Sequence, residues 1–172
     1  MRISKKYLIF TIIISVFALA INAYIIMHSC LNATASTEAS SGVIETTEEI
    51  INGIKPGTIN ESNYSDFATF IRKAFGHFGL FSISGFLTSL SIFLLINPVK
   101  NSKYYMPIVI SLEFGLLMGL ITETIQLNVP GRSGELTDVL IDFSGYLLGF
   151  LLILLILFLI IKHLNKKEAT ND

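Results

Sequence analysis

Residues 121–161 read ITETIQLNVPGRSGELTDVLIDFSGYLLGFLLILLILFLII. The second half, residues 139–161, is an almost entirely apolar run, and about 20 apolar residues suffice for a helix to cross a hydrocarbon core roughly 30 Å thick. The first half places carboxylate, guanidinium and amide side chains among apolar ones. An ionisable side chain at hydrocarbon depth costs at least a few kcal/mol, so such residues face protein or water and usually have a function.

The composition of the whole chain is that of an integral membrane protein. Of its 172 residues 52% are hydrophobic and 15% are charged, and the mean hydropathy is +0.66. Three further segments have the length and apolar content of a membrane span, at about residues 7–27, 76–96 and 104–127. The predicted fold class is therefore an all-α integral membrane protein with four transmembrane helices.

Lysine and arginine residues predict the orientation, because short cytoplasmic loops collect them. Three basic groups belong on one side of the membrane: Arg2, Lys5 and Lys6, then Lys100 and Lys103, then Lys162, Lys166 and Lys167. Both termini are therefore predicted to be cytoplasmic. Arg72, Lys73 and Arg132 fall on the opposite side, where this rule does not explain them.

The chain divides into four regions. Residues 1–27 form the first transmembrane helix with a basic cytoplasmic N-terminus, and its apolar run is longer than the roughly 7 to 15 residues of a cleaved signal core. Residues 28–70 form an acidic, Ser/Thr-rich extracellular segment, predicted as a flexible or lightly structured loop with at most a short surface helix at 45–54. Residues 71–161 form a three-helix core, and residues 162–172 a cytoplasmic tail.

Helical spacing predicts where the acids point, because residues three, four, seven or eight apart share a face. The acids are in line with pairs of glycines: Gly115, Gly119 and Glu123 in the third span, and Asp138, Asp142, Gly145 and Gly149 in the fourth. Such small-residue pairs mark faces where helix backbones approach closely. The carboxylates should therefore point into the bundle, and at 1.5 Å per residue Glu123 and Asp142 should each lie about 6 Å below the outer end of their helix.

The other polar residues near the outer end complete a predicted site. Lys73 and His77 share a face by a spacing of four, and the turn at Pro130 brings Arg132 between the last two helices. We predict a pocket that opens to the outer leaflet and is lined by Arg72, Lys73, His77, Glu123, Gln126, Arg132, Asp138 and Asp142. The alternative is scaffolding, in which Arg132 or Lys73 pairs with a carboxylate to hold the helices in one register.

Several of these residues also form a pattern that resembles the VanZ-like family. The match runs from about residue 70 to residue 149 and consists of FIRKAFGHF at 70–78, Glu123-xx-Gln126, Pro130-Gly-Arg132, Asp138 with Asp142, and Gly145-xxx-Gly149. Phe81 departs from the tyrosine that many members have. The resemblance implies a multi-pass protein of the bacterial cell membrane, in a family whose name-giving member is associated with low-level resistance to the glycopeptide teicoplanin.

The leading functional hypothesis is an accessory protein that engages an envelope molecule at the outer leaflet. Arg132 offers a planar fork suited to phosphate or carboxylate. The partners expected are membrane lipids, together with a lipid-linked cell-wall precursor or a lipoglycopeptide antibiotic. A net charge of −1 argues against nucleic acid.

The rival hypothesis is a membrane-embedded enzyme that acts on lipid headgroups or cell-wall precursors. His77 with Glu123 and its neighbouring aspartates has the groups for general acid–base catalysis or for a divalent cation. However, the sequence contains no HExxH pair, no nucleophilic serine signature and no Cys/His cluster. An accessory, non-catalytic role is therefore favoured, and no cofactor or metal site is assigned from the sequence.

Overall fold

The computed structural model describes residues 4–96 and 105–168, and in these ranges the regular structure is entirely helical. The elements are α1 (Lys5–Ser29), α2 (Ala33–Ile54), α3 (Tyr64–Ile71), the π-helix η1 (Arg72–Gly79), α4 (Leu80–Ile96), α5 (Tyr105–Gln126) and α6 (Leu136–Glu168). The helices α3, η1 and α4 follow one another without a break. Lys100 and Lys103, which were used to predict the orientation, lie outside the described residues.

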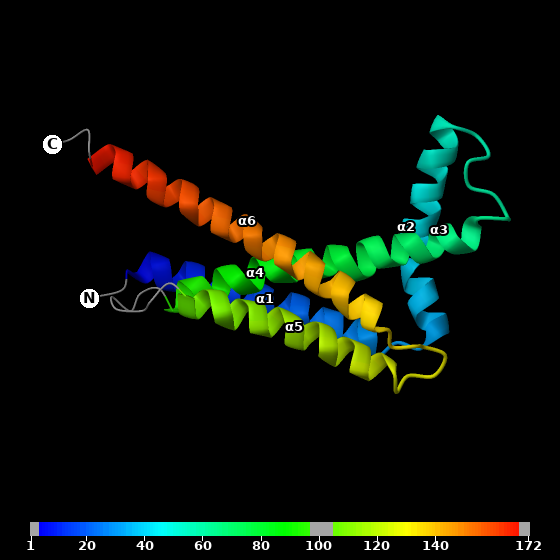
Figure 1. Cartoon of the computed structure of the whole chain (residues 1–172), viewed down its shortest axis with the longest axis horizontal. Coiled ribbons are helices and arrows are strands. Elements are labelled where there is room, and N and C mark those ends of the chain that lie inside the picture. Colours follow the sequence, from blue (N-terminus) through cyan, green and yellow to red (C-terminus); the bar gives the residue numbers. More distant parts are fainter. Residues whose placement is uncertain (1–3, 97–104, 169–172) are drawn as a thin grey trace.

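Four helical segments are long and apolar enough to cross a membrane, which confirms the predicted fold class. They are Lys5–Ser29, Tyr64–Ile96, Tyr105–Gln126 and Leu136–His163. The second segment begins twelve residues earlier than the predicted 76–96, because α3 and η1 extend α4 toward its N-terminus. Figure 1 shows that the start of α1 and the end of α6 lie at the same end of the bundle.

The segment between α1 and α3 is not the loop that its composition predicts. Residues Ala33–Ile54 form the 22-residue helix α2, capped by Asn32, whose side chain accepts a hydrogen bond from the Ala35 amide at 2.9 Å. Serine and threonine hydroxyls along α2 bond back to its own carbonyls, as Thr47 does to Val43 at 2.7 Å. In Figure 1, α2 lies across the end of the bundle, roughly perpendicular to its axis.

Three of the four glycines predicted to serve packing lie where helix α6 meets its neighbours. A Cβ added at Gly145 would overlap with the Phe78 carbonyl, one at Gly149 would overlap with the backbone of α4, and one at Gly115 would overlap with the ring of Tyr146. Gly119 differs, since a Cβ there would make ordinary contacts at 3.5 Å. Helix α6 therefore approaches α4 and η1 closely enough to bring their polar side chains together.

Hydrogen bonds between side chains join α1 to α4 through the interior of the bundle. The Asn22 amide donates to Thr88 at 2.8 Å and accepts from the Ser84 hydroxyl at 2.8 Å. One turn further in, Ser15 and Ser91 are bonded at 2.7 Å. Each such bond within a membrane is worth on the order of 1 kcal/mol. These bonds fix the position of α1 against α4, which continues directly from η1.

Candidate functional site

The π-helix η1 supplies three of the four basic side chains of the predicted site. A π-helix bonds residue i to residue i+5, which widens each turn, and such segments occur frequently at functional sites. The eight residues of η1, RKAFGHFG, include Arg72, Lys73 and His77. The change from α to π geometry therefore coincides with three of the eight residues predicted to form the site.

His77 meets one buried acid from each of the last two helices. Its Nδ1 atom lies 3.0 Å from Oδ1 of Asp142 on α6 and 3.9 Å from Oε1 of Glu123 on α5. Only 4% of Glu123 and 0% of Asp142 is exposed. The two carboxylates thus lie at one level, as the helical spacing predicts, and one imidazole joins them.

Hydrogen bonds from neighbouring groups orient both carboxylates. Glu123 accepts from the side-chain amide of Gln126 at 3.0 Å and from the backbone amide of Glu135 at 2.9 Å. The second bond ties α5 to the residue just before α6. The hydroxyl of Thr122 lies 3.4 Å from Oδ2 of Asp142. Each carboxylate therefore has an additional partner besides His77.

Lys73 forms the ion pairs at the mouth of the site. Its Nζ atom lies 2.5 Å from Oδ1 of Asp138 and 3.2 Å from Oε2 of Glu135. The hydrogen bond from Lys73 lowers the pKa of the Glu135 carboxyl. The other oxygen of Asp138 lies 3.8 Å from Nε2 of His77. The scaffolding contact expected of Lys73 is therefore present.

Among the described residues, the two arginines of the predicted site form side-chain hydrogen bonds to neutral partners only. Arg132 donates to the Ser36 hydroxyl at 2.7 Å and to the side-chain oxygen Oε1 of Gln126 at 2.5 Å. Arg72 donates to Thr37 at 3.4 Å and to Thr69 at 3.3 Å. Within the described ranges neither guanidinium has a carboxylate within 4.0 Å. Pairing of Arg132 with a carboxylate, the other scaffolding contact considered, is thus not found.

The charge of Arg132 is held in an unfavourable environment. Burial lowers the pKa of its guanidinium, the carboxylate of Glu123 opposes this shift, and repulsion by Arg72 adds to it. Arginine still keeps its proton at any physiological pH. The end of the bundle next to α2 therefore holds two mutually repelling cations, and among the described residues neither has a carboxylate within 4.0 Å.

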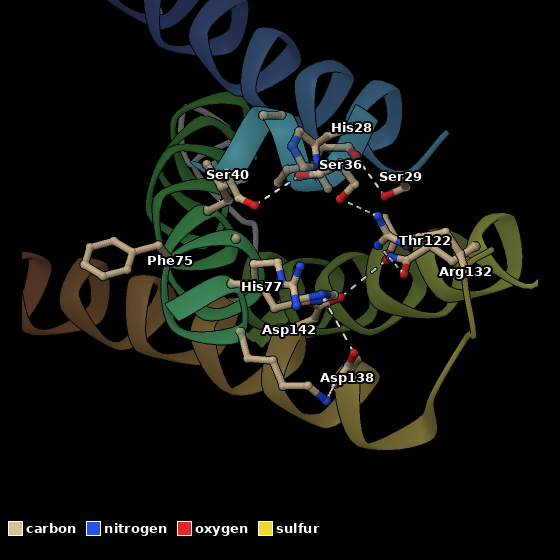
Figure 2. Close-up of a pocket in the computed structure, with 18 of the residues that line it drawn as sticks. His28, Ser29, Ser36, Ser40, Phe75, His77, Thr122, Arg132, Asp138 and Asp142 are labelled. Atoms are coloured by element: carbon tan, nitrogen blue, oxygen red, sulfur yellow. Dashed lines mark hydrogen bonds and ion pairs between the residues drawn. The ribbon is translucent and has the colours of Figure 1, made fainter. Parts of the chain in front are cut away.

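These residues surround a cavity of about 690 Å³ between α1, α2, η1, the C-terminal end of α5 and the N-terminal end of α6. Of the predicted site residues, all but Glu123 line it; Glu123 is not among the lining residues. In Figure 2, Ser36 and Ser40 lie on the opposite side from Asp138 and Asp142, and the ring of Phe75 points away.

One part of the cavity lining is an apolar wall, and most of its residues were not predicted from the sequence. It includes Tyr24 and Ile25 of α1, Val43 of α2, and Leu80 and Ile83 of α4. The contribution of α2 was missed because that segment was interpreted as a loop. The available signal was the capping Asn32, followed by a run of 22 residues without proline.

Comparison with known proteins gives one family. A family model described as VanZ/LLP1 matches residues 7–159, which is most of the chain and extends the resemblance noted at residues 70–149 in both directions. No curated protein and no solved structure matches.

Proposed function

The chain belongs to the VanZ/LLP1 family, and from its site we propose that it binds the anionic headgroup of a lipid-linked envelope molecule at the outer leaflet of the bacterial cell membrane. Binding of this kind contributes to teicoplanin resistance. The observation that carries the proposal is the pair of arginines, Arg72 and Arg132, that face the cavity without a carboxylate in contact.

The arginines favour an anion because a charge taken out of water needs a partner of opposite sign. Lys73 already has two carboxylates, whereas Arg132 has only a hydroxyl and an amide oxygen. A guanidinium binds phosphate or carboxylate through two parallel hydrogen bonds, which are stronger than bonds to neutral acceptors. A phosphate that enters the cavity would relieve the repulsion between Arg132 and Arg72.

The apolar wall favours a ligand with a lipid tail. Phe75 and Ile83 line the cavity, yet 56% and 51% of their surfaces are exposed. They lie on a helix that crosses the membrane, so this side of the cavity adjoins the acyl chains. A headgroup held by the arginines could therefore leave its tail in the bilayer.

The distribution of lysines supports an outward-facing site. Lys5 and Lys6 begin α1, and Lys162 lies near the end of α6, at the end of the bundle opposite to α2 (Figure 1). The excess of lysine that is typical of cytoplasmic segments favours a cytoplasmic position for that end. The cavity then lies at the level of the outer headgroups.

The test compares a charged and an uncharged lipid on the purified chain in nanodiscs. The probes are a photoreactive polyprenyl phosphate and the matching polyprenol. We expect crosslinking of the phosphate in strong preference to the alcohol. Arg132→Gln should lower the affinity for the phosphate about tenfold or more, the value of a hydrogen bond between charged groups. Lys55→Gln is the matched control, because Lys55 is exposed and does not line the cavity.

Two results would count against the proposal: equal labelling by phosphate and alcohol, or unchanged affinity in Arg132→Gln. Teicoplanin added as a competitor identifies the ligand further. Displacement of the polyprenyl phosphate by the antibiotic shows that both occupy the cavity. If the phosphate and the alcohol label the chain equally and teicoplanin displaces both, the cavity binds the antibiotic, and the lipid assignment is overturned.

A second candidate function is hydrolysis or transfer at the lipid headgroup. It is favoured by His77, which lies within 4 Å of two buried carboxylates at the edge of the cavity. The assay is mass spectrometry of a polyprenyl diphosphate incubated with the wild type or with Glu123→Gln. Product formed by the wild type and lost in the variant would establish catalysis; an unchanged lipid would leave binding as the function.

A further inference from the structure

We infer that His77, Glu123 and Asp142 form a binding site for one divalent transition-metal cation of the Zn²⁺ or Mn²⁺ type. The site adds a cation to the cavity that His77, Asp142 and Arg132 line. Its relation to the headgroup rests on the proposed function, but metal binding itself does not.

The three side chains are close enough to share an ion. One ligand atom of each lies within 4.8 Å of the other two. Metal–nitrogen and metal–oxygen bonds of about 2.0–2.2 Å place two ligands of one ion up to roughly 4 Å apart. The distances from His77 Nδ1, 3.0 Å to Asp142 and 3.9 Å to Glu123, are already within that limit. Small side-chain rotations therefore complete the site.

Charge balance gives an independent reason for a cation. Glu123 and Asp142 are almost completely buried, and in residues 4–96 and 105–168 neither has a lysine or arginine nitrogen within 4.0 Å. A protonated His77 would neutralise only one of the two charges. Lys73 is held by Asp138 and Glu135. A divalent cation would neutralise both carboxylates at once and leave His77 neutral.

The groups behind the three residues match the surroundings of known metal sites. A histidine ligand commonly donates its other ring N–H to a carboxylate, which fixes the orientation of the ring. Nε2 of His77 faces Asp138 at 3.8 Å, while Nδ1 faces the proposed ion. Glu123 is oriented by Gln126 and Asp142 by Thr122. Each ligand thus has a neighbour that restricts its position.

The donor set narrows the choice of ion. One imidazole and two carboxylates suit zinc, manganese or iron better than calcium, which takes six to eight oxygen ligands. Three protein ligands also leave a coordination position open, as in metal sites that bind substrate. His77 and Asp142 line the cavity, so an anionic headgroup held by Arg132 would approach the ion from the cavity.

Metal binding is tested on the full chain in a neutral detergent without lipid. Equilibrium dialysis against ZnCl₂ or MnCl₂, followed by elemental analysis, should give about one ion per chain, since the cluster has three protein ligands. His77→Gln, Glu123→Gln and Asp142→Asn should each weaken binding by roughly tenfold or more. Glu113→Gln is the matched control, an exposed acid on the same helix as Glu123.

A spectroscopic measurement on the wild type guards against variants that do not fold. Pulsed electron paramagnetic resonance of the Mn²⁺-loaded chain should show modulation from one coordinated imidazole nitrogen. No bound ion at millimolar metal, binding equal in all variants, or a signal without nitrogen coupling would each overturn the inference and leave a metal-free His77–Asp142 pair. The metal-binding assay contains no lipid, so a negative result leaves the crosslinking test of the proposed function unaffected. Equal crosslinking by the phosphate and the alcohol would likewise leave the number of bound metal ions per chain unchanged.

Discussion

Nδ1 of His77 on η1 lies 3.0 Å from Oδ1 of Asp142 on α6, and the two residues are 65 positions apart in the chain. This contact depends on Gly145, one turn further along α6, where the backbone of α6 passes against the Phe78 carbonyl. The same close approach that packs the bundle thus sets the geometry of the site. Packing and function cannot be altered independently at this interface.

The coupling between His77 and Asp142 is the first prediction. In a double-mutant cycle with His77→Gln and Asp142→Asn, the two changes should be non-additive by at least about 1 kcal/mol, because buried partners in contact interact by 0.5–3 kcal/mol. The measurement is reversible unfolding in detergent. A parallel cycle with His77→Gln and Glu113→Gln should be additive, since Glu113 is exposed and forms no ion pair with His77.

Gly145→Ala should destabilise the bundle much more than Gly119→Ala. The added methyl group at Gly145 meets a backbone carbonyl, which cannot rotate away, and overpacking of this kind costs about 1–3 kcal/mol or more. At Gly119 the contacts are ordinary ones at 3.5 Å and alanine favours the helix. Thermal unfolding of the two variants provides the comparison. Equal stabilities would show that α6 does not approach η1 so closely.

Ser36→Ala should loosen α2 from the bundle. The Ser36 hydroxyl accepts from Arg132 at 2.7 Å, and a hydrogen bond to a charged group contributes about 1.5–3 kcal/mol. Hydrogen–deuterium exchange in α2 should therefore speed up by about tenfold or more. Ser41→Ala is the control, because the Ser41 hydroxyl bonds only to the Glu38 carbonyl of its own helix. Equal exchange in the two variants would contradict the docking role.

The direction in which Glu123 and Asp142 point could be predicted from the sequence, because it follows from one physical rule. Side chains aligned with close-packing glycines face the neighbouring helix. Asp142 is aligned with Gly145 and Gly149, and Glu123 is aligned with Gly115. His77 followed from its spacing to Lys73, although the segment is a π-helix and not an α-helix. The shift to π geometry left no signal in spacing, since both forms place residues four apart on about the same side.

Helix α2 could not be predicted by the same reasoning. Its serine and threonine residues are poor helix formers on their own, and tertiary contacts stabilise the helix instead. Ile44 packs against Ala68 and Ile71 of α3, and Ser36 binds Arg132. These contacts join residues far apart in sequence, so a local pattern does not contain them. For the same reason the neutral partners of Arg132 were not foreseen.

The acid dependence of stability should carry a contribution from Glu135. Lys73 lowers the pKa of this carboxyl below its ordinary 4.5 in the folded chain, so the folded state binds the proton less readily than the unfolded state. The resulting stabilisation is complete above the ordinary pKa and is lost as the pH falls through the lowered value. Unfolding midpoints between about pH 7 and pH 3 should therefore fall less steeply in Glu135→Gln than in the wild type. A steeper fall in the variant would contradict the sign of the shift.

Teicoplanin susceptibility should change in a sensitive host that expresses the chain. The wild type should raise the inhibitory concentration, because a chain that binds a lipid-linked envelope molecule acts where the antibiotic works. Arg132→Ala should abolish the rise, since it removes the guanidinium that faces the cavity without an acidic partner. Asp142→Ala should do the same by releasing His77. Lys55→Gln is the control at matched membrane abundance. Full resistance in both site variants at that abundance would show that resistance does not depend on the cavity. Loss of resistance in all three variants, including Lys55→Gln, would point to a general effect of lowered stability.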